Sequence, residues 1–173
     1  MVNLIDISYF DESPYLIPIG EMLPEQSLTD QIEKRQREFL ISVLGFQEYY
    51  NLENDNGGDL PITQKWVDFI EGVFYQKDNY NIDYKGIREA LQRYVYFWYI
   101  RNNLTQMTEA GGVELQFENS IRKSGNQNAV DAYNEMTNLI GSEANYEPTI
   151  FNYLNDHDFD AIVTEFEHVN TIL

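Results

Sequence analysis

The stretch YVYFWYIRNNLTQMTEAGGVELQFENS, from Tyr94 to Ser120, decides the fold. It opens with five aromatic residues in six positions, namely Tyr94, Tyr96, Phe97, Trp98 and Tyr99. A surface helix needs only one apolar stripe, and a helix that is apolar nearly all round is normally enclosed. The enclosing side chains can come from the same chain, which the burial preference of apolar residues favours. They can also come partly from another subunit, because aromatic residues are enriched at interfaces.

A second feature of this stretch is the pair Gly111-Gly112, where the chain is expected to reverse after the central helix. Beyond it, Val113, Leu115 and Phe117 alternate with polar residues, a pattern typical of a short strand. The edge of such a strand can pair with a neighbouring subunit. The five aromatic residues and these three apolar ones are therefore the candidate interface residues.

Helical periodicity predicts further helices on both sides of the aromatic run. Ser27 is suited to cap a helix at residues 27–45 that Gly45 ends or kinks, with a short helical turn at 46–52 after it. The other expected helices occupy residues 61–74, beginning at Pro61, then 86–104, 128–140, 148–154 and 158–169, with a polar connection at 76–85.

These elements predict a mainly α fold: a small helical bundle of about four to six helices, with a minor β element and irregular terminal arms. Along the chain, we expect an N-terminal arm at residues 1–26, a helical core at 27–140 and an acidic C-terminal helical extension at 141–173. The first residues have no basic region and no long apolar run, which argues against a secretory signal. No segment has the length and apolarity of a membrane span.

The formal net charge of −18 is distributed unevenly. All 11 lysine and arginine residues lie between Lys34 and Lys123, together with 13 acids, whereas the two ends hold the other 16 acids and no lysine or arginine. Binding of nucleic acid or anionic membrane through a basic patch is therefore disfavoured. The acidic ends can serve solubility, repel DNA that must slide past, or meet a basic partner.

The sequence contains no motif of a known catalytic or nucleotide-binding site, so no catalytic, cofactor-binding or metal-ligating residue is predicted. Without cysteine, disulfides and thiolate chemistry are excluded, as is usual in a reducing cytosol. His157 and His168 are interpreted as surface residues. The stretch DHDFDAIVTEFE at 156–167 partly matches a calcium loop, but Ala161 stands where the sharp turn needs glycine. An acidic helix N-terminus is the favoured interpretation.

Five short motifs follow one another in a particular order. They are the helix opening LPEQSLTDQIEKRQREFLISVLGF with Val43-Leu44-Gly45 near its end, Tyr84-Lys85-Gly86-Ile87, the aromatic run, Thr108 with Gly111-Gly112-Val113 and Glu118-Asn119-Ser120, and Ala132-Tyr133-Asn134-Glu135-Met136. This order resembles the small head–tail connector (adaptor) proteins of tailed bacteriophages and prophages, of the type found with Bacteroidetes-type hosts. The resemblance covers about residues 22–140. Ile87 replaces the more usual leucine, and Gly112 is an additional glycine.

The resemblance implies a structural virion protein and not an enzyme. Its place would be the neck between head and tail, after synthesis in the host bacterial cytoplasm. It implies a homo-oligomeric ring, of twelve subunits, that docks on the portal protein, receives tail or stopper proteins and lets genomic DNA pass without specific binding. Neither a cofactor nor a membrane partner is implied.

Two alternatives stay open. The first is an acidic DNA mimic that inhibits a DNA-binding enzyme, which the net charge permits but which neither the uneven charge nor the aromatic helix requires. The second, ranked third overall, is an enzyme whose metal is bound by Asp156, Asp158 and Asp160.

Overall fold

The computed structural model describes residues 3–12, 14–17, 25–55, 61–103, 105–108, 111–114, 125–141, 148–160 and 166–169. Within these ranges the helices are the short 3₁₀ helix η1 (Ile7–Phe10), α1 (Glu25–Asn54), α2 (Gln64–Glu71), α3 (Arg88–Asn103), α4 (Gly125–Ile140) and α5 (Ile150–Asp156). The strands form two antiparallel hairpins, β1 (Val73–Lys77) with β2 (Tyr80–Tyr84), and β3 (Thr105–Thr108) with β4 (Gly111–Glu114). The predicted class, a mainly α bundle with a minor β element, is confirmed.

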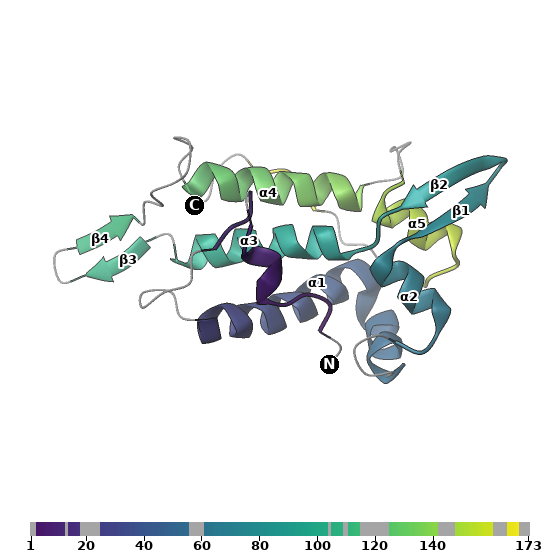
Figure 1. The fold of residues 1–173 in the computed structure, drawn as a ribbon, viewed down its shortest axis with the longest axis horizontal. Helices are drawn as coiled ribbons and strands as arrows, with labels where there is room; N and C mark the ends of the chain where they lie inside the picture. Colours follow the sequence, from purple (N-terminus) through teal and green to yellow (C-terminus); the bar gives the residue numbers. More distant parts are fainter. Residues whose placement is uncertain are drawn as a thin grey trace.

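The aromatic helix α3 is the middle helix of a layer that it forms with α1 and α4 (Figure 1). The β1–β2 hairpin, α2 and α5 lie together at one end of this layer, and the β3–β4 hairpin lies at the other (Figure 1). Helices α1 and α4 thus cover α3 on two sides. The two remaining faces of α3 must be covered by other segments if its apolar side chains are to be buried.

The N-terminal segment covers one of these faces. Because an α-helix turns by about 100° per residue, Gln92 and Tyr96 share a face of α3. Gln92 donates a hydrogen bond through Nε2 to the backbone carbonyl oxygen of Tyr9, and the ring of Tyr96 lies 5.4 Å from that of Tyr15. The segment that contains η1 is therefore packed against the middle of the layer.

The C-terminal segment covers the opposite face. Tyr94 lies on nearly the other side of α3 from Gln92 by the same geometry. The ring of Phe39, on α1, is 5.1 Å from Tyr94 and 6.2 Å from Phe166. Between Tyr94 and Ile100 helix α3 is covered mainly by its own chain, which explains why this part of it is apolar nearly all round, whereas Glu89, Arg101 and Asn102 nearer its ends are exposed.

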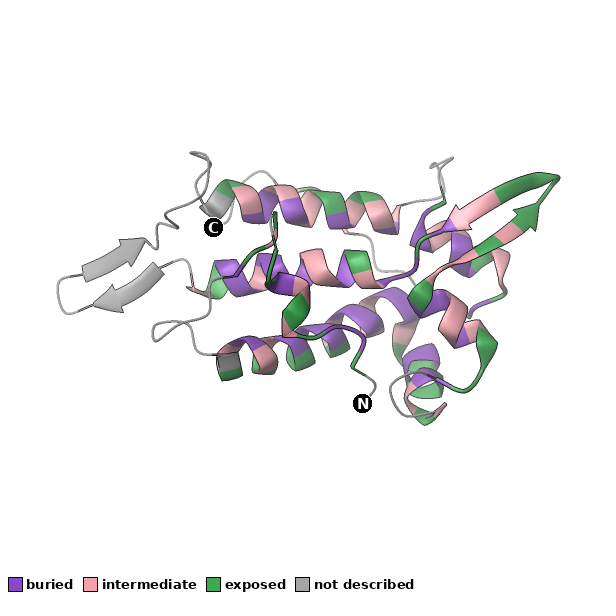
Figure 2. Ribbon diagram, viewed as in Figure 1, coloured by how far each residue is buried: buried purple, intermediate pink, exposed green. Residues whose placement is uncertain are grey.

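The terminal segments belong to one hydrophobic core with the helices (Figure 2). Its members from outside residues 27–140 are Leu4, Ile5, Phe10, Ile17, Ile150, Tyr153, Leu154 and Phe159. The expected arm at 1–26 and extension at 141–173 therefore contribute, where they are described, to the same packed unit as the helical core.

Two glycines act at helix ends as the sequence predicts. Gly45 has φ 75° and ψ 166°, so it kinks α1 where the prediction placed an end or a kink. Gly141 follows α4 with φ 74°. Both conformations are accessible to glycine at little cost, since it has no Cβ.

The helix predicted at 61–74 is wrong at both ends. It begins at Gln64 rather than Pro61, and it ends at Glu71. Val73 and Phe74, predicted on its apolar face, open strand β1, and the expected polar connection at 76–85 contains most of the β1–β2 hairpin. Gly72, with φ 92° and ψ 161°, separates helix from strand.

The turn of this hairpin is formed by Asp78 and Asn79, which have φ 48° and 69°. Positive φ at both central residues matches the right-handed twist of the strands, and Asp and Asn tolerate it better than most residues. The last predicted helix is also wrong where it is described: Asp158 has φ 51°, Phe159 and Asp160 are not helical, and neither is 166–169. Residues 161–165 lie outside the described part.

Candidate interaction surface

The aromatic residues predicted at an interface lie mostly in the core. Tyr94, Tyr96, Phe97 and Tyr99 are buried and Trp98 is half-buried. Four of the five side chains therefore offer almost no surface to a partner in this conformation. Among the other candidates, the backbone of Val113 is in β4, whereas the side chain of Val113 and both Leu115 and Phe117 lie outside what the structure describes.

Exposed large apolar side chains gather at another place. Five of the six among the described residues lie in the last part of α1, just before α2 and on the β1–β2 hairpin, namely Phe46, Tyr50, Ile62, Phe74 and Tyr80. We call these five residues the hairpin-end surface, because their segments share one end of the layer (Figure 1). Phe74 and Tyr80 are 76% and 75% exposed.

Among the described residues, the polar contacts that anchor the hairpin lie on one of its faces. Oη of Tyr75 donates to Oδ2 of Asp156 at 2.9 Å, and Lys77 forms an ion pair with the same carboxylate. The ring of Tyr75 also lies edge-on to that of His157, at 4.6 Å. Since side chains alternate along a strand, Phe74 points to the opposite face, away from α5. Tyr80, paired with Lys77 at the tip, shares the anchored face but is exposed.

The base of the hairpin is fixed by contact between two glycines. A Cβ placed on Gly72 would lie 2.4 Å from the backbone oxygen of Tyr84, and one placed on Gly86 would lie 2.3 Å from that of Ile70. The side chain of Tyr84 donates to the backbone oxygen of Phe69 at 3.1 Å. The direction in which the hairpin projects is therefore determined by backbone packing.

Ion pairs offset part of the negative charge at this end of the protein. Lys65, Lys77, Lys85 and Arg88 each pair with an acid, the last through an Arg88–Glu71 contact of 2.7 Å. Residues 46–55, 61–88 and 148–160, which form this end, contain four basic and ten acidic side chains.

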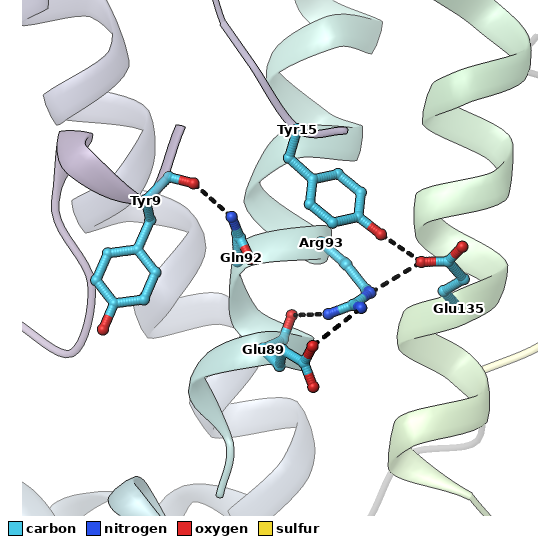
Figure 3. A network of polar contacts seen from close by, with 6 residues as sticks. All are labelled: Tyr9, Tyr15, Glu89, Gln92, Arg93 and Glu135. Atoms are coloured by element: carbon cyan, nitrogen blue, oxygen red, sulfur yellow. Dashed lines mark hydrogen bonds and ion pairs between the residues drawn. The ribbon is translucent and has the colours of Figure 1, made fainter. Parts of the chain in front are cut away.

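A polar network holds the N-terminal segment to α3 and α4 (Figure 3). Glu135 of α4 accepts a hydrogen bond from Tyr15 and forms an ion pair with Nε of Arg93 at 3.0 Å. Arg93 also pairs with Glu89, at 3.2 Å. Burial, and next the hydrogen bond to Glu135, raise the pKa of Tyr15 to about 12, although Arg93 acts in the other direction.

This pKa predicts a loss of stability at alkaline pH. Tyr15 ionises at its ordinary pKa of 10.0 when the chain is unfolded and at about 12 when it is folded. Its contribution to stability is therefore complete below pH 10 and is lost as the pH rises toward 12. We expect a Tyr15→Phe variant to lose stability less steeply than the native chain in this window. Denaturant unfolding across the window would measure it, and equal slopes for the two proteins would contradict it.

The described residues contain no group of three or more His, Asp or Glu that could hold a metal ion. Asp156 is at the C-terminal end of α5, so the interpretation of DHDFD as a helix N-terminus is wrong. The calcium-loop alternative includes residues 161–165, which the structure does not describe. Nδ1 of His157 is 3.0 Å from the backbone oxygen of Tyr153. Within the described part of the chain, no helix has the length and apolarity needed to cross a membrane.

Comparisons with models of protein families, with curated proteins and with solved structures find no match to this chain.

Proposed function

We propose that this chain is a subunit of a head–tail connector ring, which docks on a phage portal and joins the capsid to the tail while DNA passes through. Several of the motifs that suggest this family lie where one element of the fold ends or bends and the next begins. Val43-Leu44-Gly45 leads into the kink of α1, and Tyr84-Lys85-Gly86-Ile87 joins β2 to α3. Gly111 and Gly112 begin β4, which pairs with β3, so the chain reverses just before these glycines and not at them.

The observation that carries the proposal is the hairpin-end surface. A ring requires a heterologous contact, in which one patch of a subunit meets a different patch of the next. The hairpin exposes Phe74 on one face and Tyr80 on the other, at its tip, and so offers apolar side chains for contact with a different patch of the next subunit. Two-stranded hairpins also have unpaired edges that can accept a further strand.

The charge distribution fits a DNA channel. A lumen should repel phosphate so that the genome slides without binding, and acidic segments repeated on every subunit would provide that repulsion. The hairpin-end surface would then form the contacts between subunits, and the acidic ends of the sequence would face the lumen.

Light scattering of the native chain, alone and with a portal ring, tests the proposal. We expect a ring in at least one condition. We expect a Phe74→Ser/Tyr80→Ser variant to weaken assembly at least about tenfold, because burying one such side chain is worth roughly 1.5–3 kcal/mol. Gln76→Ser/Asn81→Ser is the matched control, since both residues are exposed on the same hairpin.

A native chain that remains monomeric in the presence of the portal would contradict the proposal. If the control variant Gln76→Ser/Asn81→Ser lost assembly to the same extent, the hairpin-end surface could not be the contact between subunits. In the first case the acidic DNA mimic becomes the leading function, and a nuclease competition assay with this chain would test it.

A further inference from the structure

The two hairpins lie at opposite ends of the helical layer, and each is a separate sheet of two strands (Figure 1). Among the described strands, β1 pairs with β2 alone and β4 pairs with β3 alone. Each strand therefore has an outer edge whose backbone N–H and C=O groups bond to no other described strand. Such an edge can accept a further strand from another chain.

The ring of Phe74 has only polar neighbours across its own hairpin. Phe74 is paired with Asp83, and the residues two positions before and after Asp83, on the same face, are Asn81 and Lys85. Lys85 forms an ion pair with Asp83, and its Nζ lies 6.0 Å from the centre of the Phe74 ring. The apolar surface of this ring, which is 76% exposed, is therefore open to a strand added at the outer edge of β1.

The β3–β4 hairpin has few side chains with which to stabilise itself. Met107 is paired with Gly112 and Thr108 with Gly111, so half of its cross-strand pairs have no side chain on β4. Such pairs stabilise a sheet, and a two-stranded hairpin alone is marginally stable in water. This hairpin lies beyond the ends of α1 and α4, and its main contacts among the described elements are between its own strands (Figure 1). It would be stabilised by a further strand.

An aromatic ring and a glycine are complementary on adjacent strands. Glycine leaves room for another chain to approach closely, and an aromatic side chain on the next strand can cover the gap. Phe74 provides the ring at one end of the molecule, and Gly111-Gly112 provides the uncovered backbone at the other end (Figure 1). Because these two features lie at opposite ends, a single copy does not bring them together, whereas two copies arranged head to tail can.

We propose that β4 of one copy adds to the outer edge of β1 of the next copy, so that Phe74 covers Gly112 in a four-stranded sheet of order β2-β1-β4-β3. This inference rests on the proposed function and deepens it, because it identifies the patch that meets the hairpin-end surface. Pairing between two different hairpins is a heterologous contact, and it leaves an unpaired hairpin at each end for a further copy. Copies joined in this way form a ring when the rotation between them closes.

Cross-linking between two single-cysteine variants of the full chain tests the inference, since the native chain has no cysteine. One variant carries Gln76→Cys, on the face of β1 that holds Phe74, and the other carries Glu114→Cys, two positions after Gly112 on β4. A short bis-maleimide reagent is added to each variant and to their mixture, with and without the portal ring. An affinity tag on one variant separates the products by mass, so each product shows which ends have met.

We expect the product that joins the two variants to far exceed the product of either variant alone, because a head-to-tail contact brings unlike ends together. Adding Phe74→Ser to the Gln76→Cys chain should lower its yield at least about tenfold, since the apolar contact is lost. Adding Asn81→Ser is the matched control, because this residue is exposed on the same face of the hairpin, and it should change the yield little. Circular dichroism of each variant shows that it is folded.

A second substitution tests the role of the glycine. Gly112→Val in the Glu114→Cys chain should also lower the yield, because the valine side chain fills the space that the Phe74 ring would occupy. Valine suits a strand better than glycine does, so a glycine with no part in the contact would leave the yield unchanged or raise it. Once Gly112→Val is present, Phe74→Ser should have little further effect, since both changes remove the same contact.

A mixed product no more abundant than the products of like variants would overturn the inference, as would a mixed yield that Phe74→Ser does not change. A native chain that forms a ring on the portal without the mixed product would refute this contact and leave the proposed function standing. A mixed product from a chain that ignores the portal would do the reverse, so each of the two proposals can fail alone.

Discussion

Gly72→Ala and Gly86→Ala are each expected to lower the free energy of unfolding by about 3–5 kcal/mol. The backbone of Gly72, with φ 92° and ψ 161°, is in a region that is essentially restricted to glycine. The added Cβ would also lie 2.4 Å from the oxygen of Tyr84, or for Gly86 2.3 Å from that of Ile70. Neither obstacle is a side chain that can rotate away.

Denaturant unfolding of the two variants measures this loss, with Gln76→Ala on the exposed part of β1 as the control. The control should stay within about 0.5 kcal/mol of the native chain. Because the glycines fix the direction of the hairpin, we also expect the variants to assemble poorly at temperatures where they remain folded. A loss below about 1 kcal/mol for both glycine variants would mean that the hairpin base adapts easily, and the argument for a rigid hairpin would fail.

The helices that the sequence predicts well are those with local signals at their ends. Gly45 and Gly141 lie where the backbone changes direction, and both can be predicted from the sequence, because glycine takes such conformations at little cost. The aromatic run at 94–99 identifies an enclosed helix for the same local reason. Such features depend on neighbouring residues alone.

The β1–β2 hairpin is harder to predict, because two patterns compete in the same residues. Apolar spacing from Trp66 to Phe74 continues at a helical period through Gly72, and this favours one longer helix. The strand alternation of Tyr75 and Lys77 is short, and the turn at Asp78-Asn79 lacks the glycine of the commonest hairpins. The contact of Gly72 with the residues around Gly86 is non-local, and it decides the outcome.

The candidate site shows a different limit of sequence reasoning. A run of aromatic residues predicts burial, but composition does not say whether the chain's own termini or another subunit provides the cover. Here Tyr15 packs on Tyr96 of α3, whereas Phe166, 151 positions later, packs on Phe39, which contacts Tyr94 of the same helix. Asn134, whose side chain is hydrogen-bonded to the backbone of Val169, carries no distinguishing signal in the sequence either, since an asparagine on a helix is usually a solvated side chain and its partner is 35 residues away.

Phe39→Ala is expected to lower the free energy of unfolding by about 3–5 kcal/mol. Phe39 is fully buried, and its ring joins three parts of the fold: α1, Tyr94 on α3 and Phe166 of the C-terminal segment. Removing it leaves a cavity among aromatic rings that cannot easily move together. Denaturant unfolding measures the loss, and hydrogen exchange at the Val169 amide should accelerate, because the segment loses its inward contact.

Phe46→Ala, seven residues later on the same helix, is the matched control. Its ring is 68% exposed and belongs to the hairpin-end surface, so we expect stability within about 0.5 kcal/mol of the native chain. We expect assembly, in contrast, to weaken in Phe46→Ala when it is measured by light scattering with the portal. The same chemical change thus separates the two roles of the aromatic residues, core for Phe39 and contact surface for Phe46. Equal losses of stability in both variants would show that Phe46 stabilises the fold as Phe39 does. That result would contradict the assignment of the hairpin-end surface as an interface.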